Sequence, residues 1–326
     1  MDMSTQEAHR HSATPTVMLA ADKPTGEQPM ELFITDEHTE HYLALQTGGE
    51  FDRGAMAGLC GWVFIGCIAV GIYSLIQSAE LKGLYIMLGI GLPMFLVPFL
   101  WEVLRPLPLP ILFNRRTREV YFDHDGDLYH APWDGISAVA NEFQLVGTQI
   151  GGMQNASLEI RMWKFEDPAT ALMVSLGPPF GKSLAMQKGF WEYIRSYMNN
   201  GPYFDEHGNH SESDAFVKSQ LAVRFKMSDS FKQTLAQLKQ AKNDAGGKNY
   251  LGASDVAKLI LEPLLYPQDR IQELTYSLAK RRSRNLWPKI VTDRLQANGP
   301  TTRLVDLEHE QGYGVPKEGG SIPYER

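Results

Sequence analysis

Two long runs without a charged residue constrain this chain more than any other feature. Residues 54–79 (GAMAGLCGWVFIGCIAVGIYSLIQSA) contain no Asp, Glu, Lys or Arg, and neither do residues 83–101 (GLYIMLGIGLPMFLVPFLW). Each run is close to the roughly 20 residues that cross the hydrocarbon core of a bilayer as a helix. Buried helices of a soluble core are the alternative, but such helices normally carry a polar stripe. The runs therefore predict a transmembrane hairpin over residues 54–101.

The distribution of positive charge predicts the orientation of this hairpin. The link between the two runs is only Glu80-Leu81-Lys82, so both flanks emerge on the same side of the membrane. Arginines stand close to the outer ends of the hairpin: Arg53, Arg105, Arg115, Arg116 and Arg118. Because positive charge accumulates on the cytoplasmic side, we expect both termini in the cytoplasm.

Composition limits the remaining classes of function. The formal net charge of the 326 residues is −7, which argues against a general nucleic-acid binder. The two cysteines, Cys60 and Cys67, both lie in the first apolar run. They form neither a disulfide framework nor a zinc-binding pattern, so we interpret them as small packing residues.

The rest of the chain divides by composition into five further segments. Polar residues 1–29 predict a disordered leader, and residues 30–53 hold two short alternating stretches, ELFITD and HYLALQT, that we expect to join a later β domain. Residues 106–202 predict that cytoplasmic β domain, interrupted by the hairpin. Residues 203–296 have helical periodicity, and the polar, glycine-rich residues 297–326 predict a flexible tail.

Within residues 106–202 the pattern is several strands followed by one helix. Residues 118–123 and 128–131 alternate as strands do, and Asp125-Gly126 between them is a strong turn signal. The period changes to 3.6 near residues 190–199, where Phe190, Ile194 and Tyr197 share one helical face. The predicted fold class is therefore membrane α+β, with a β domain closed by a terminal helix and a helical C-terminal region.

This order of elements resembles the small pleckstrin-homology-like domains that bacteria attach to membrane helices, through the core NRRTREVYF followed by DG and PW. The segments FWEYIRSYMNNGP and RNLWPKI are similar to parts of the bacterial domain-of-unknown-function family 6708. The resemblance covers about residues 30–205, and more weakly 260–295. It implies two membrane helices plus such a domain, the bacterial inner membrane, and a genomic setting near type VI secretion effectors.

None of the candidate motifs predicts catalysis or a cofactor. GPPFGKS at residues 177–183 is one residue short of a phosphate-binding loop, and its prolines lack N–H donors. DHDGD at residues 123–127 has its glycine at the wrong place for a calcium-binding EF-hand loop and reads as a hairpin turn. The histidines are scattered and are expected to lie in exposed loops. We expect no catalytic residue, no cofactor and no metal.

One dense basic run is the candidate contact site: Lys280, Arg281, Arg282 and Arg284. At the end of a predicted helix, these side chains would complement the helix dipole and face an anionic inner leaflet or a partner. A solvated helix end is the alternative.

The leading hypothesis is therefore a non-enzymatic, membrane-anchored protein-binding module. By the family resemblance its partner is a secreted toxin effector of type VI secretion, which the chain neutralises as an immunity protein or handles as an accessory protein. The alternatives are an inner-leaflet lipid-binding scaffold and a divergent enzyme whose site forms only in three dimensions.

Overall fold

The computed structural model describes residues 16–48, 53–78, 80–147, 151–222, 230–244, 246, 252–283 and 286–313. The chain forms two compact units, each assembled from separate segments. Residues 1–47, 110–222 and 287–326 form a sheet unit, and residues 48–109 and 223–286 form a helical unit. The mixed α and β class predicted from the sequence is confirmed.

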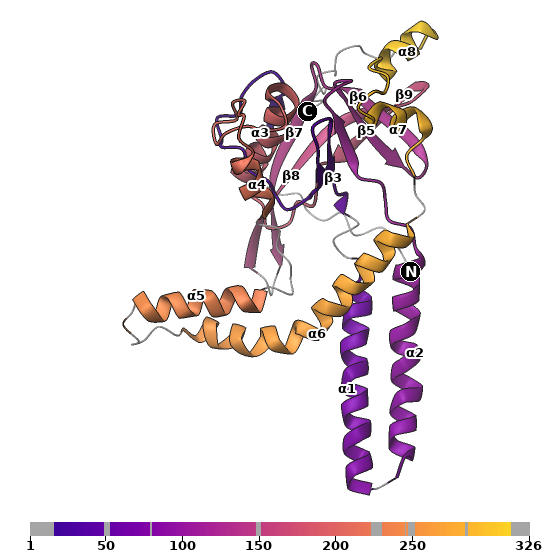
Figure 1. Ribbon diagram of the computed structural model, residues 1–326, viewed down its shortest axis with the longest axis vertical. Helices are drawn as coiled ribbons and strands as arrows, with labels where there is room; N and C mark the ends of the chain where they lie inside the picture. Colours follow the sequence, from indigo (N-terminus) through magenta and orange to yellow (C-terminus); the bar gives the residue numbers. More distant parts are fainter. Residues whose placement is uncertain are drawn as a thin grey trace. The chain divides into compact units, whose positions relative to one another are not determined.

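The sheet unit is built on one curled antiparallel sheet (Figure 1) with the strand order β1-β7-β8-β6-β5-β4-β3-β2, and β9 pairs with β8. The strands are β1 (Thr16–Ala20), β2 (Thr35–His38), β3 (Tyr42–Leu45), β4 (Ile111–Asn114), β5 (Glu119–His124), β6 (Asp127–Pro132), β7 (Ser137–Gly147), β8 (Gly151–Lys164) and β9 (Asp167–Ser175). β5 and β6 form a hairpin whose central residues, Asp125 and Gly126, have φ angles of 55° and 91°. These left-handed angles at both positions match a type I′ turn.

One face of the sheet is covered by helix α3 (Leu184–Asn200). Ser183 caps this helix, since its side chain accepts a hydrogen bond from the Met186 backbone N–H. The helix buries a face of large side chains in the main core, including Phe190, Trp191 and Ile194. Because successive side chains of a strand point to opposite faces, Phe113 and Val120 join this core while their neighbours point away.

The opposite face holds a second apolar cluster. It contains Ala44, Leu112, Tyr121 and Leu128 from the strands and Val291 and Leu304 from helices α7 (Lys289–Leu295) and α8 (Leu304–Glu310). Helix α4 (Ala215–Ala222) belongs to the same unit and buries Val217 in the main core. The sheet is therefore buried on both faces over part of its width.

The helical unit contains α1 (Ala55–Ser78), α2 (Lys82–Leu104), α5 (Ser230–Asp244) and α6 (Ala253–Arg282). The first two are antiparallel, and both are long and apolar enough to cross a membrane. Only 11% of the most apolar stretch of α1 and 6% of that of α2 are buried. A core helix of a soluble protein would be mostly covered by protein, so these two helices leave an apolar surface that needs another partner.

Two charged residues, Arg53 and Glu102, connect the start of α1 to the end of α2. The Glu102 carboxylate accepts hydrogen bonds from the backbone N–H groups of Gly54 (3.1 Å) and Ala57 (2.8 Å), at the start of α1. Arg53 donates to the backbone carbonyls of Glu102, Arg105 and Pro106, at the end of α2. An anion at a helix N-terminus and a cation at a helix C-terminus both interact favourably with the helix dipole. The Arg53 and Glu102 side chains therefore hold the two helices together at this end of the hairpin.

Three expected boundaries need correction. The leader expected over residues 1–29 is wrong from Thr16 onward, because β1 pairs with β7 and places Leu19 in the core; residues 1–15 lie outside the described part. The tail expected over residues 297–326 contains α8, whose Leu304 is buried. The helical region expected over residues 203–296 is divided, because α4 and α7 belong to the sheet unit.

Candidate functional site

The predicted basic run lies at the C-terminal end of α6. Lys280, Arg281 and Arg282 occupy the last helical turn, and all three side chains are exposed. Arg284 lies outside the described residues. The next residue after the helix, Ser283, accepts a hydrogen bond at its hydroxyl oxygen from the backbone N–H of Leu107 (3.3 Å). The basic turn is thus held close to the exit of α2 inside the helical unit, where cations also complement the dipole of α6.

The sheet unit contains an open cavity of about 410 Å³. It lies where the end of β1, the turn before β5, the corner after β6 and the end of α3 meet. Its lining residues are Ala21, Asp22, Arg118, Trp133, Asp134, Gly135 and Asn199. The volume falls in the range of small-ligand or side-chain sites.

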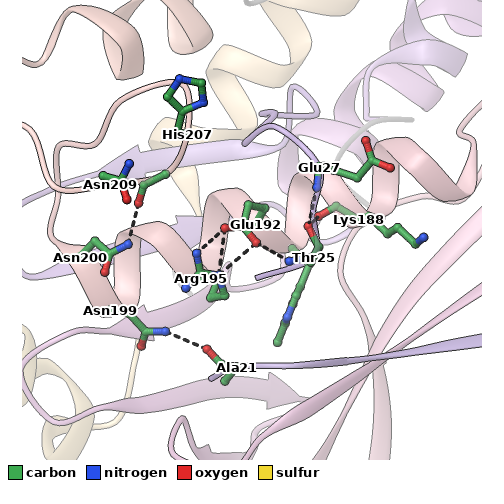
Figure 2. Close-up of polar contacts among 12 residues, drawn as sticks. Ala21, Thr25, Glu27, Lys188, Glu192, Arg195, Asn199, Asn200, His207 and Asn209 are labelled. Carbon is green, nitrogen blue, oxygen red and sulfur yellow. Dashed lines mark hydrogen bonds and ion pairs between the residues drawn. The ribbon is translucent and has the colours of Figure 1, made fainter. Parts of the chain in front are cut away.

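Hydrogen bonds connect the residues that form the wall of this cavity. The Arg118 guanidinium donates to the Asp134 carboxylate (2.8 Å) and to the side-chain oxygen of Asn199 (3.2 Å). The same Asn199 oxygen accepts from the buried Trp133 indole (2.8 Å), and its amide donates to the Ala21 carbonyl (2.7 Å; Figure 2). Arg118 has a φ angle of 54°, a conformation that most L-residues avoid. The cavity therefore presents one fixed cation and the carboxylates of Asp22 and Asp134.

A second polar cluster holds the segment after β1 against α3 (Figure 2). Glu192 is 2% exposed, and its carboxylate accepts from the backbone N–H of Thr25 (2.9 Å) and from Arg195 on the next helical turn. The Thr25 hydroxyl donates to the Lys188 carbonyl (3.3 Å). A buried carboxylate is stable when it is paired and hydrogen-bonded, as Glu192 is. We interpret this cluster as structural support for the cavity wall.

A third cluster is fully buried on the face covered by α8. The His130 imidazole lies 2.8 Å from the Glu308 carboxylate and 3.8 Å from that of Glu119. Glu308 also accepts the backbone N–H of Glu166 (2.7 Å), and Glu119 accepts that of Val305 (3.1 Å). Burial alone would lower the pKa of His130, but the two carboxylates outweigh it and raise that pKa to about 8. The cluster thus holds α8 on the sheet through charged groups.

The segment 177–183 joins β9 to α3. The backbone N–H of Gly181 donates to the Asn155 side chain (3.0 Å), and Ser183 is used as the helix cap. Lys182 is 8% exposed, and its amine has no hydrogen-bond partner among the described residues. Burial lowers the pKa of this amine to about 8, although the nearby Glu31 opposes the shift. The segment thus forms a crossover with one poorly solvated lysine.

The expectation of exposed histidines is wrong at two positions, His38 and His130. His38 is largely buried, and its two ring nitrogens lie 2.9 Å from the Tyr193 hydroxyl and 2.6 Å from the Pro202 carbonyl. Burial lowers its pKa. Within the described ranges, no three His, Cys, Asp or Glu side chains are grouped so that they could hold a metal ion.

Comparison with known proteins gives no relative. The chain matches no protein-family model, no curated protein and no solved structure. The resemblances stated from the sequence therefore stay predictions.

Proposed function

We propose that this chain is a membrane-anchored binding module. In this proposal α1 and α2 form an integral anchor, and the sheet unit, a pleckstrin-homology-like domain, binds a protein partner on the cytoplasmic side. The observation that carries the proposal is the uncovered apolar surface of the two helices, since a long apolar helix with exposed side chains is stable in lipid and poorly soluble in water.

The positions of the basic residues at the two ends of the hairpin support the direction of insertion. Arg53 and Glu102 stand at the end of the hairpin that continues into the strands, whereas the link carries only Glu80 and Lys82, which lie 3.8 Å apart. Counted as Lys and Arg alone, the end that leads into the sheet unit has Arg53 and Arg105 against Lys82 at the link, and this excess of basic residues favours that end in the cytoplasm. By the family resemblance the membrane is the bacterial inner membrane.

The cavity at the end of α3 is the proposed contact region for the partner. It combines an exposed rim, a guanidinium and two carboxylates on a hydrogen-bonded frame that needs little ordering on binding. The buried acid-base groups of the unit, such as His130 and Glu308, hold α8 in place, which favours a binding role over catalysis. The family resemblance gives the partner as a type VI secretion effector, handled by an immunity or accessory protein.

Membrane integration is tested by alkaline carbonate extraction. We expect the wild-type chain to stay in the membrane pellet. A double variant, Val70→Asp and Val97→Asp, places a charge in each helix at an exposed position and should release the protein, because a buried charge costs about 3 kcal/mol per helix. Leu286→Asp is the matched control, since Leu286 is 83% exposed outside the two helices. A wild-type chain that is extracted would contradict the anchor.

Partner binding is tested by site-specific photocrosslinking in native membranes. A benzophenone amino acid at Asp22, on the cavity rim, should give one discrete protein adduct. The same probe at Asp125, an exposed turn residue with a side chain 96% exposed, should give none. Adducts of equal yield at both positions, or none at either, would overturn the proposed contact region.

A lipid-binding scaffold is the second candidate function. It is favoured by the three exposed cations of the last turn of α6, which would face anionic headgroups. In this case Arg281→Gln with Arg282→Gln should lower the share of anionic lipid that co-purifies with the protein, and crosslinking at Asp22 should give no protein adduct. Lys289→Gln, another exposed lysine in the sheet unit, is the control.

A further inference from the structure

We propose that the N-terminal half of α6, residues 253–266, lies in the membrane interface, with its apolar face embedded at the boundary between headgroups and acyl chains. This inference rests on the proposed anchoring by α1 and α2. It assigns a lipid-contacting surface to a segment that is neither charge-free nor long enough to span the bilayer.

The first observation is an exposed apolar stripe on α6. Its members are large aliphatic side chains, each between 43% and 64% exposed: Val256, Ile260, Leu261, Leu264 and Leu265. At about 100° per residue these positions spread over one half of the helix surface. The acidic side chains Asp255, Glu262 and Asp269 fall on the other half. Contiguous apolar patches of this kind mark interaction sites.

The second observation is that α5 leaves this stripe uncovered. The contact between the two helices includes a hydrogen bond from the Thr234 hydroxyl to the Glu262 carboxylate (2.9 Å), on the polar side of α6. Figure 1 shows α5 running beside the N-terminal half of α6. The pair therefore forms a two-helix element whose open face is the aliphatic one.

The third observation is that the stripe continues the face of α6 that contacts α1. Ile271 and Gln268 lie seven and four residues after Leu264, and so on the same side of the helix. Both pack on glycines of α1, Ile271 on Gly61 and Gln268 on Gly58. Since α1 is the proposed membrane-spanning helix, the same side of α6 faces lipid where the helix leaves α1. Pro263 lies within the stripe and Pro267 lies between the two parts, and both prolines allow the helix to bend there.

The fourth observation fixes the depth. The Trp62 indole donates to the Leu264 carbonyl (2.6 Å), so this part of α6 lies level with Trp62. Counted back from Ser78 at the far end of α1, about 20 residues span a 30 Å hydrocarbon core and reach residue 59. Trp62 therefore lies about 5 Å inside the near boundary, the depth at which tryptophan and interfacial helices are found.

These observations favour lipid over a second copy of the chain or a protein partner. A protein occupant would have to reach the stripe at a depth where the surface of α1 is already in acyl chains. An interfacial position satisfies both the aliphatic side, which enters the acyl boundary, and the acidic side, which stays with water and α5.

The test is spin-label accessibility in the full-length protein, reconstituted in vesicles of phosphatidylethanolamine and phosphatidylglycerol. The protein carries Cys60→Ala and Cys67→Ala, so that each label attaches only to the cysteine that is introduced. Single labels are placed at Ile260→Cys on the stripe, at Arg270→Cys on the opposite, exposed side, and at Val70→Cys on α1. Collisions with oxygen report lipid, and collisions with a water-soluble nickel chelate report water. We expect the oxygen-to-nickel ratio at Ile260 to be several-fold higher than at Arg270 and close to that at Val70.

Two results would overturn the proposal while Val70 still reports lipid. High nickel accessibility at Ile260 would place the stripe in water, and shielding from both reagents would show that protein covers it, whether a second copy or a partner. If Val70 itself reports water, the membrane anchor fails first and this inference falls with it. Leu261→Asp with Leu265→Asp gives a second check, since it should raise nickel accessibility at Ile260 and leave Val70 unchanged.

Discussion

The imidazole of His130 lies 2.8 Å from the carboxylate of Glu308, and both side chains are fully buried. The contact joins β6 to α8, which are far apart in the sequence, and Glu119 faces the same imidazole from β5. A buried charge is tolerated only when it is paired, so the three groups depend on one another.

The first prediction concerns pH. The folded-state pKa of His130 is raised to about 8, above the unfolded value of about 6.5. Its contribution, about 2 kcal/mol, should be fully present below pH 6.5 and be lost as the pH rises through 8. Unfolding in detergent between pH 6.5 and 8 measures this loss. His130→Gln should remove the pH dependence in this window, and His124→Gln, at the exposed end of β5, should retain it.

The second prediction concerns the partner of that histidine. Glu308→Ala removes one buried carboxylate and the acceptor for the Glu166 N–H, and should destabilise the sheet unit by about 3–5 kcal/mol. Limited proteolysis should then cleave within residues 296–303 much faster than in the wild type. Glu310→Ala, on the exposed end of the same helix, serves as the control. Equal protection of both variants would show that α8 is held by apolar contacts alone.

The third prediction concerns the packing of α6 on α1. A Cβ atom at Gly58 would lie 2.8 Å from the backbone carbonyl oxygen of Gln268, so Gly58→Val should force the helices apart at a cost of about 1–3 kcal/mol. Gly66→Val is the matched control in the same helix, because a Cβ atom there meets nothing within 4 Å. Crosslinking between cysteines at positions 62 and 264 reports the separation. Unchanged crosslinking in Gly58→Val would refute this packing.

The fourth prediction concerns Lys182. Its folded-state pKa of about 8 lies below the unfolded value of about 10.4, so the folded state disfavours the charged amine at neutral pH. Stability should therefore rise with pH from about 8 to 10.4. Lys182→Met should raise stability at pH 7 by up to about 3 kcal/mol and abolish that rise. The control is Lys188→Met, since Lys188 is partly exposed in α3. This substitution should neither raise stability at pH 7 nor remove the rise with pH.

Local patterns in the sequence were sufficient to predict the most regular parts of the fold. The sequence predicts the two apolar helices because charge-free runs of 26 and 19 residues have few other stable arrangements. The β5–β6 hairpin follows from alternation around Asp125-Gly126, whose left-handed turn few other residue pairs adopt. Both signals come from neighbouring residues and need no knowledge of the tertiary structure.

The candidate sites could not be predicted in the same way. The cavity depends on Asn199, which brings Trp133, Arg118 and Ala21 together from three distant segments. The sequence alone predicts an exposed loop position for His130, because no local pattern tells a buried imidazole from a solvated one until its carboxylate partners are known. The sequence correctly predicts that the basic run lies at the end of a helix. Its role in lipid or partner contact stays a prediction.

The pairing of β3 with β4 has a consequence for the architecture of the chain. These strands are adjacent and antiparallel, with Leu45 opposite Ile111. A short turn would be enough to connect them, but residues 46–110 connect them instead. Residues 223–286 likewise leave and rejoin the sheet unit between α4 and α7. The helical unit thus consists of two segments that are inserted into the sequence of the β domain. It could be gained, lost or exchanged in evolution without breaking a single strand pairing.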